Sequence, residues 1–243
     1  MHIASSRKNT QSGLRNTVMI LLMWFSFSLA ILLLVLMPLA FTEIMMSGLA
    51  KLHLSADAAS LLVLFMLFGG AINIPILRFH SGRRICVQPL VSHGVFGFHS
   101  GFTKATNETV VAVNLGGCVI PVGLALFEFT RLMAADSGSF WAVVGVSSIN
   151  IFICYDLARI VPGIGITLPG LMPAFAAAGL ALVFLPQEAT PIAFIAGVAG
   201  PLIGADLLHL PQLRKLPVGM LSIGGAGTFD GIVLAGIIAA YLA

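Results

Sequence analysis

The uncharged run Val18–Phe41, VMILLMWFSFSLAILLLVLMPLAF, decides the class of this fold. A bilayer core of about 30 Å needs about 20 apolar residues in a helix, and this run exceeds that length. The rest of the chain has the same character, since 58% of its residues are hydrophobic, 9% are charged and the mean hydropathy is +1.06. We therefore expect an all-α, polytopic transmembrane bundle of about seven helices, with residues 1–243 forming a single membrane domain.

Short polar stretches, prolines and glycines divide the apolar sequence into segments that each suit one membrane crossing. The expected spans are 18–41, 58–77, 109–130, 139–158, 170–185, 191–210 and 218–242. The longest interruption is the loop 78–107, which alternates apolar and polar residues around Ile85–Gln88 and Phe96–Phe98. That alternation is typical of a small β-hairpin or of an amphipathic surface segment. No stretch is long enough for a large soluble domain.

Basic residues set the expected orientation, because Lys and Arg near helix ends accumulate on the cytoplasmic side. With the N-terminus inside, only Lys51 and Arg131 of the 12 Lys and Arg residues fall outside. The others fall inside: Arg7, Lys8, Arg15, Arg78, Arg83, Arg84, Lys104, Arg159, Arg214 and Lys215. We therefore expect a multi-pass protein of the cell (inner) membrane, with its N-terminus in the cytoplasm and its C-terminus outside.

The expected partners follow from the same charge distribution. The net charge of +3 belongs to the cytoplasmic edge, where it suits anionic lipid head groups, so we expect no nucleic-acid partner. Cys86, Cys118 and Cys154 lack the spacing of a disulfide or zinc site, and we expect no metal and no cofactor. The lipid bilayer is one partner, and a small solute, an ion or a transmembrane peptide is another. Assembly into a homo-oligomer stays open.

Acidic residues inside the membrane are the best candidates for function, because a carboxylate at a helix centre costs about 2.5–3.5 kcal/mol on insertion scales. Most of the nine acids lie at expected helix boundaries, and Glu128 is expected at the solvated outer end of the third span. Asp156, Asp206 and Asp230 remain as candidates. Arg159 follows Asp156 by three residues and would pair with it on a helix, which favours a structural role for Asp156.

The segment Ser222–Gly231, SIGGAGTFDG, sets the depth of Asp230. A regular helix from Val218 would carry Asp230 about 18 Å along it, near the membrane centre. If the glycines are unwound instead, Thr228 becomes an N-cap and Asp230 falls in the first turn of a half-helix, 228–243. We favour the broken arrangement, because unwound backbone at membrane depth lines a site or lies buried in protein. Close packing of helices through the glycines is the alternative.

Two further groups complete the predicted site. His209 follows Asp206 by three residues, so the two side chains share a helical face and are expected to pair. Asn114 is expected either to line the site or to hydrogen-bond between helices. The predicted catalytic residues are Asp206 and Asp230, with Asp156 as the alternative. The predicted binding residues are Gly224, Gly225, Gly227, Thr228, Asn114 and His209.

Four segments between Ala71 and the C-terminus resemble a prokaryotic membrane-protein family of unknown function, domain of unknown function 1614. They are Thr109–Gly117 (TVVAVNLGG), Arg159–Ile166 (RIVPGIGI), Ile203–Leu208 (IGADLL) and Ser222–Gly231 (SIGGAGTFDG). The resemblance implies a helical membrane protein in which Asp206 and Asp230 matter. It implies no reaction.

The chain is also similar, more faintly, to presenilin-type intramembrane aspartyl proteases. Tyr155-Asp156 looks like their Tyr-Asp motif, Gly227–Asp230 looks like a degraded Gly-x-Gly-Asp motif, and Leu168–Leu171 looks like their Pro-Ala-Leu element. The order and the glycine positions depart from that family. This resemblance implies an Asp dyad in which one carboxyl group acts as base on water while the other acts as acid.

Two functions that use these residues remain open from the sequence, and a structural or assembly function also stays open. The first is transport or binding of a small solute or ion through the Gly-rich broken helix, with Asp206 and Asp230 binding a cation or relaying protons. The alternative is an intramembrane aspartyl protease. Transport needs a cavity and one acid, whereas proteolysis needs two acids close together. The sequence favours transport because it is the commoner task of such folds, and whether the chain is an enzyme stays open.

Overall fold

The computed structural model describes residues 2–80, 108–135, 138–161, 165–213, 220–225, 227 and 230–243. The chain separates into two units, Met1–Glu43 and Ile44–Ala243. The first unit is part of α1 (His2–Ala50), a single helix that includes the run from which the fold class was inferred. Its side chains from Met19 onward are largely exposed, as suits a helix whose surface is covered by lipid.

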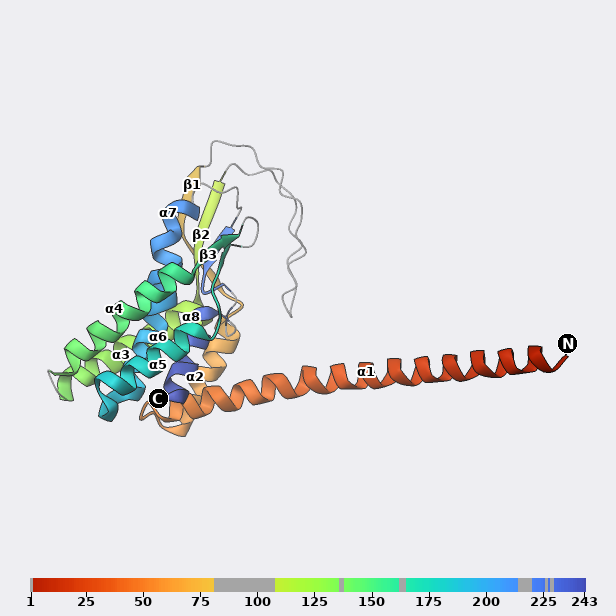
Figure 1. Cartoon of the computed structure of the whole chain (residues 1–243). Coiled ribbons are helices and arrows are strands. Elements are labelled where there is room, and N and C mark those ends of the chain that lie inside the picture. The colour runs from red at the N-terminus through yellow and green to blue at the C-terminus, as the bar shows by residue number, and fades with distance from the viewer. Residues whose placement is uncertain are drawn as a thin grey trace. The chain divides into compact units, whose positions relative to one another are not determined.

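The second unit is a bundle of apolar helices with strands gathered at one end (Figure 1). Its elements after the end of α1 are α2 (Ala56–Gly69), β1 (Asn73–His80), β2 (Glu108–Asn114), η1 (Leu115–Val119), α3 (Ile120–Ala135), α4 (Ser139–Leu157), β3 (Arg159–Val161), β4 (Gly165–Thr167), α5 (Met172–Phe184), η2 (Pro186–Glu188), α6 (Ala189–Ala199), η3 (Gly200–Leu207), α7 (Leu208–Leu213), β5 (Met220–Ile223) and α8 (Gly231–Leu242). Of these, η1 and η3 are π-helical and η2 is a 3₁₀ turn.

Four helical segments among the described residues are long and apolar enough to cross a membrane: Met19–Ala50, Leu115–Ala134, Ser139–Leu157 and Pro186–Gln212. Three shorter apolar helices, α2, α5 and α8, match the remaining expected spans. The helical membrane bundle expected from the sequence is therefore confirmed.

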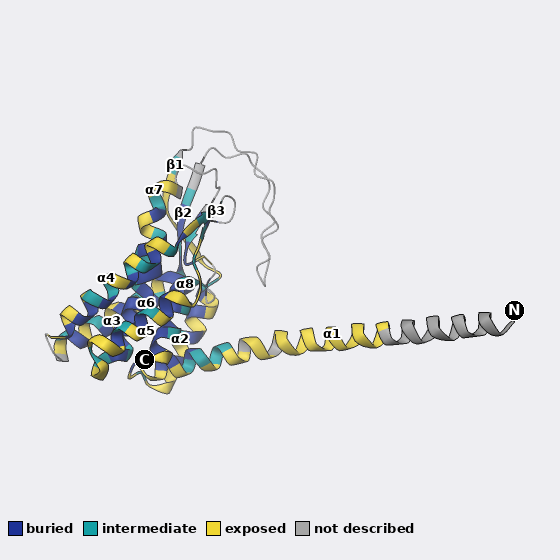
Figure 2. Cartoon of the chain, viewed as in Figure 1, coloured by how far each residue is buried: buried dark blue, intermediate teal, exposed yellow. Residues whose placement is uncertain are grey.

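The core of the bundle is α6, which contacts α3, α4, α5 and α8. Nearly all of its side chains are buried, and Figure 2 shows the buried residues concentrated around it. Small residues allow the close approach that packing in a membrane requires. A Cβ on Gly197 would lie 2.6 Å from the carbonyl oxygen of Ala235, and a Cβ on Gly236 would lie 2.7 Å from Val198 Cγ2. The helices α6 and α8 are therefore in backbone contact.

The second expected span is shorter than 58–77, because α2 ends at Gly69 and residues 73–77 lie in strand β1. Strand β1 pairs antiparallel with β2, and β5 pairs parallel with β2, which gives the order β1-β2-β5. Pro75 is tolerated because β1 is an edge strand with an irregular register after this residue. Ile-rich sequence around Asn73 suits a strand as well as a helix, which is why hydrophobicity misassigned it.

The third expected span, 109–130, begins later than expected, because residues up to Asn114 form β2 and the helix starts with η1. Strands β1 and β2 thus make a hairpin that flanks the expected loop 78–107. Residues 78–80 belong to β1, whereas the hairpin expected within the loop lies outside the described residues.

The last expected span, 218–242, is broken, and that part of the interpretation is confirmed. Residues 220–223 form β5, a glycine turn follows, and the half-helix α8 begins at Gly231. The expected N-cap is wrong, however. Asp230, and not Thr228, caps α8, because its side chain accepts a hydrogen bond from the backbone N–H of Ile232 at 3.0 Å. Thr228 itself lies outside the described residues.

A network of polar groups around the buried Asn114 joins the strands to the helices. Asn114 is fully buried, and its Nδ2 donates to the carbonyl oxygen of Gly70 at 2.8 Å and to Asn73 Oδ1 at 3.1 Å. Its Oδ1 accepts from the backbone N–H of Gly117 at 2.7 Å, which caps η1. The Ser222 hydroxyl donates to Asn73 Oδ1 and so links β5 to this network. Asn114 therefore satisfies backbone groups where α2 ends and η1 begins.

We predict that Asn114→Ala lowers the free energy of unfolding by about 2–4 kcal/mol, because it leaves the buried N–H of Gly117 and the partly buried carbonyl of Gly70 without their partner. Thermal unfolding of the purified protein in detergent measures the change. Thr130→Ala is the matched control on α3, since the Thr130 hydroxyl makes an exposed local bond to the carbonyl oxygen of Phe127. Equal stability of the two variants would contradict the structural role given to Asn114.

Candidate functional site

Helices α6 and α8 run antiparallel, and this register places the two candidate acids. Gly197 meets Ala235, and farther along the same pair Pro201 lies 4.0 Å from the position of a Cβ on Gly231. Asp230 directly precedes Gly231, while Asp206 follows Pro201 along η3. The level of Asp206 is therefore about one turn, roughly 5 Å, beyond that of Asp230.

The two acids lie close enough for the charge of Asp230 to act on Asp206, and both charges act on the thiol of Cys118. These three residues come from three separate segments, η3, the N-cap of α8 and η1. Asp206 and Asp230 are partly buried, and Cys118 is 6% exposed. The structure thus brings together the two predicted catalytic residues and adds Cys118, which the sequence did not predict as a site residue.

Each of the two helical segments in this cluster has π geometry, which is rare and occurs frequently at functional sites. Cys118 lies in η1, and Asp206 lies in η3. Hydrophobic periodicity does not reveal a π-helix, so nothing in the sequence pointed directly to Cys118. The adjacent Gly116-Gly117 pair was the available hint.

The glycine turn before Asp230 packs against backbone on one side and bends through left-handed conformations. Gly224 has φ +72° and Gly227 has φ +63°, which residues with a side chain rarely adopt. A Cβ on Gly117 would overlap the carbonyl oxygen of Gly224, and a Cβ on Gly227 would lie 3.1 Å from Gly70 Cα. Both glycines are buried. The close-packing role considered for them is therefore present, together with the broken helix.

Gly225 differs from the other predicted binding glycines because it is exposed and closes the turn, where its N–H donates to the carbonyl oxygen of Ser222 at 3.2 Å. The side chain of Asn114 makes its hydrogen bonds within the polar network that joins the strands to the helices. Of the predicted binding residues, Gly224 and Gly227 shape the backbone before Asp230. Asn114 instead accepts a hydrogen bond from the N–H of Gly117, the residue that packs against Gly224.

The expected pair between Asp206 and His209 is wrong. His209 is 7% exposed, and its Nδ1 lies 3.1 Å from the carbonyl oxygen of Gly204 and 2.9 Å from that of Ala205. Its ring stacks on that of Tyr155, with the centroids 4.7 Å apart and the planes at 29°. His209 therefore contacts the backbone of the turn that carries Asp206 and does not contact the carboxyl group.

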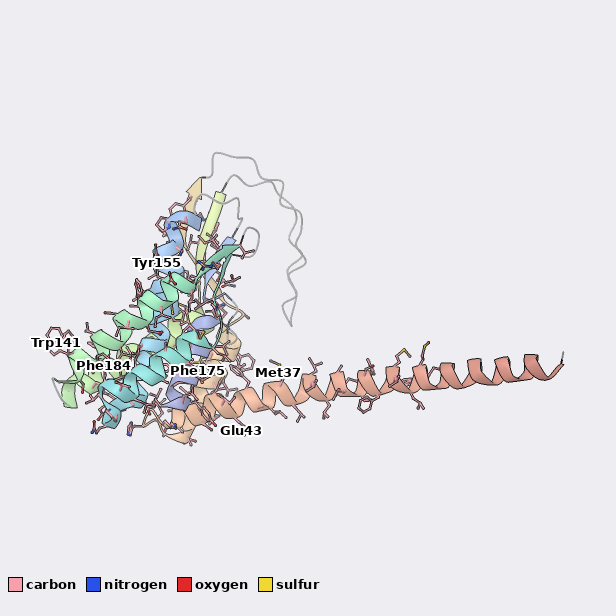
Figure 3. All side chains as sticks on the ribbon, viewed as in Figure 1. Met37, Glu43, Trp141, Tyr155, Phe175 and Phe184 are labelled. Atoms are coloured by element: carbon pink, nitrogen blue, oxygen red, sulfur yellow. The ribbon has the colours of Figure 1, made fainter. Side chains whose placement is uncertain are left out.

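The structure does not bring Asp156 into the cluster. Asp156 is an exposed residue near the strand end of α4, next to Tyr155, which Figure 3 labels. Asp156 and Arg159, both among the described residues, do not form the expected ion pair. The helix ends at Leu157 and Arg159 begins β3, so the two side chains do not share a helical face. Of the Tyr155-Asp156 motif, only the tyrosine is linked to the site, because its ring stacks on His209.

Glu128 is not at a solvated helix end, as the sequence suggested, but is 1% exposed. Arg131 Nη1 lies 3.4 Å from its carboxylate and 3.3 Å from the carbonyl oxygen of Leu52. This ion pair ties α3 to the turn between α1 and α2, and it lies in a different part of the chain from the Asp206–Asp230 cluster.

A pocket of about 420 Å³ lies between α3, α4 and the α6–η3 segment. Its lining is apolar apart from Ser147 and Ser148, and it does not include Asp206 or Asp230. The described residues hold no group of three or more His, Cys, Asp or Glu side chains that could bind a metal ion. What the cluster offers chemically is two neighbouring carboxyl groups, which can exchange a proton with each other or with water.

The fold and the site define a helical integral membrane protein with an internal pair of acids. The chain belongs to the family described as "Protein of unknown function (DUF1614)", whose model matches residues 67–242 and so includes every member of the cluster. The family resemblance found in the sequence is confirmed. Searches of curated proteins and of solved structures gave no match, and the similarity to presenilin-type proteases is not shown.

We predict that Gly117→Ala destabilises the protein by about 1–3 kcal/mol, because its Cβ would push the Gly224 carbonyl out of place. Gly123→Ala is the matched control: a Cβ there meets nothing within 4 Å, so its effect ranges from none to a gain of about 1 kcal/mol. Thermal unfolding in detergent distinguishes the two. A Gly117→Ala protein as stable as Gly123→Ala would show that the glycine turn does not pack on η1.

Proposed function

We propose that Asp206 and Asp230 act together as an acid pair and that the protein is an intramembrane aspartyl protease. The observation that supports this proposal is the register of two interrupted helices, α6–η3 and α8, which sets Asp206 about one turn from the level of Asp230 and within reach of its charge. Transport requires only one acid in a cavity, whereas hydrolysis of a peptide bond requires two acids together. The closeness of the two acids therefore supports proteolysis, whereas the sequence alone favoured transport.

The chemistry of such a pair is general acid–base catalysis. One carboxylate takes a proton from water as the water oxygen attacks the peptide carbon, and a C–O bond forms. The other carboxyl group, initially protonated, donates its proton to the carbonyl oxygen. The first carboxyl group then gives its proton to the amine as the C–N bond breaks, and the second carboxylate takes a proton from a hydroxyl of the tetrahedral intermediate, so the pair returns to its starting state. The offset of about one turn between Asp206 and Asp230 suits a pair that holds water and a peptide carbonyl between its members.

The likeness to aspartyl proteases gains one further support from a neighbouring contact. Leu168 Cδ2 lies 4.0 Å from the position of a Cβ on Gly231, so Leu168, the first residue of the Leu168–Leu171 element, lies beside the start of α8. In the orientation predicted from charge, the pair faces the cytoplasmic side of the cell membrane. The substrate would be the membrane-spanning or membrane-bordering part of another polypeptide.

Proton-coupled transport is the second candidate, and the half-helix α8 favours it. A helix of 12 residues that begins at Gly231 and is capped by Asp230 presents its positive N-terminal end beside this acid, as do the broken helices that bind ions in transporters. The transported ion would be a proton, because two neighbouring carboxyl groups can pass one between them.

A photoreactive peptide that carries a hydroxyl-bearing, tetrahedral isostere of the peptide bond tests the protease, since such a group mimics the transition state. We predict that it labels the reconstituted protein and that Asp206→Asn and Asp230→Asn each weaken its binding about 100-fold. The Asp156→Asn variant is the matched control and is expected to bind as the parent does, because Asp156 lies outside the cluster.

Absence of labelling in folded, reconstituted protein would contradict the protease. In that case proton flux into proteoliposomes decides the second candidate, which requires flux in the parent and none in Asp230→Asn. Labelling that survives both substitutions would show that the peptide binds elsewhere and would also count against the acid pair.

A further inference from the structure

The π-helical segment η3 contains one residue more per turn than the α-helices around it, and its two ends show how the register changes. At the start, the N–H of Gly200 donates to the carbonyl oxygen of Ala196, four residues back. At the end, the N–H of Leu208 donates to that of Ile203, five residues back. Asp206 lies within this widened segment, so its direction depends on the extra residue.

The sequence suits the start of the widened segment. Where bonding changes from four to five residues, one backbone N–H is left without an acceptor, and inside a membrane such a group is costly. Pro201 is the second residue of η3, and proline has no N–H. The proline therefore removes one backbone donor close to the start of the widened segment.

At the end of the segment, the return to four-residue bonding leaves one carbonyl without a backbone donor. Leu208 N–H is bonded to Ile203, so the skipped carbonyl falls at Gly204. His209 Nδ1 lies 3.1 Å from this oxygen and 2.9 Å from that of Ala205. Because both neighbours are acceptors, Nδ1 carries a hydrogen and donates it. The side chain thus supplies the missing donor.

The neighbouring helix α4 holds the His209 ring in place. Tyr155 stacks on it, and a Cβ on Gly204 would lie 3.0 Å from the backbone nitrogen of Tyr155, so α4 packs directly on the turn. His209 is therefore fixed both by the carbonyls to which it donates and by an aromatic contact, although it does not touch Asp206.

We propose that His209 is a positioning residue that keeps η3 in its π register and so directs Asp206 toward Asp230. Loss of the donor favours an ordinary α register, in which the extra residue is absorbed. Every residue after the absorbed one then rotates by about 100° around the helix axis, which turns the Asp206 side chain away from Asp230. The proposal rests on Asp206 and Asp230 being the working pair and holds for either candidate activity.

Two substitutions at one position separate the hydrogen bond from the ring contact. His209→Phe keeps an aromatic ring against Tyr155 and removes the donor. His209→Asn loses the ring but places an amide N–H close to where Nδ1 was. The probe is the rate at which a short bis-thiosulfonate bridges cysteines at 206 and 230, in a background without Cys86, Cys118 and Cys154. We expect His209→Phe to lower the rate about tenfold and His209→Asn to stay within about twofold of the parent.

A second cysteine pair, placed away from η3, controls for folding. Lys51→Cys with Tyr241→Cys joins the turn after α1 to the end of α8, where Lys51 Nζ donates to the carbonyl oxygen of Tyr241, so its bridging is expected to be unchanged in both variants. The proposal is overturned if His209→Phe bridges 206 to 230 at the parental rate, if His209→Asn falls as far as His209→Phe, or if the parent does not bridge. Bridging that behaves as expected without peptide labelling would count against the protease alone.

Discussion

Backbone hydrogen bonding at membrane depth is the constraint on which this structure depends. A helix that stops or changes register inside a bilayer leaves polar groups that lipid cannot satisfy. This chain interrupts its helices at the end of α2, in η1, in η3 and before α8. Each described interruption has a local solution: Asn114 donates to and accepts from backbone groups at the first two, His209 and Pro201 resolve the third, and Asp230 caps the fourth.

These solutions explain why so few polar side chains suffice in so apolar a chain. Two of the five buried polar side chains among the described residues, Asn114 and His209, serve the breaks, and the breaks in turn bring Asp206, Asp230 and Cys118 together from three segments. The small residues of α6 and α8 are the other requirement, because backbone contact at Gly197 and Gly236 fixes the antiparallel register of the two helices that carry the acids. A larger residue at either glycine would separate the helices and, with them, the pair.

The sequence predicted the parts of this arrangement that depend on composition. Rare acids in an apolar chain identified Asp206 and Asp230, and the run of glycines predicted the break before α8. It failed where one pattern suits two structures. The Ile-rich stretch around Asn73 was assigned to a helix and forms β1, since apolar runs do not separate strand from helix. Glu128 was placed in solvent because nothing in its local sequence shows that other elements cover it.

The site was predicted least well where helix register decides the contacts. The pairing of His209 with Asp206 assumed ordinary α geometry, in which residues three apart share a face. In η3 that assumption fails, and His209 turns to the carbonyls of Gly204 and Ala205 instead. Likewise Thr228 and Asp230 are both good N-caps by residue type, and only the packing of Gly224 and Gly227 fixes which of them begins the helix.

The central claim is that Asp206 and Asp230 face each other, and bridging between cysteines at these positions tests it most directly. The measurement uses membranes that contain the full chain without its native cysteines, a short bis-thiosulfonate and mobility on a denaturing gel after cleavage of the chain between the two sites. The account predicts a bridge between 206 and 230 and none between 156 and 230, the matched pair with the exposed acid of α4. Bridging of neither pair, or of 156 to 230 alone, would contradict it.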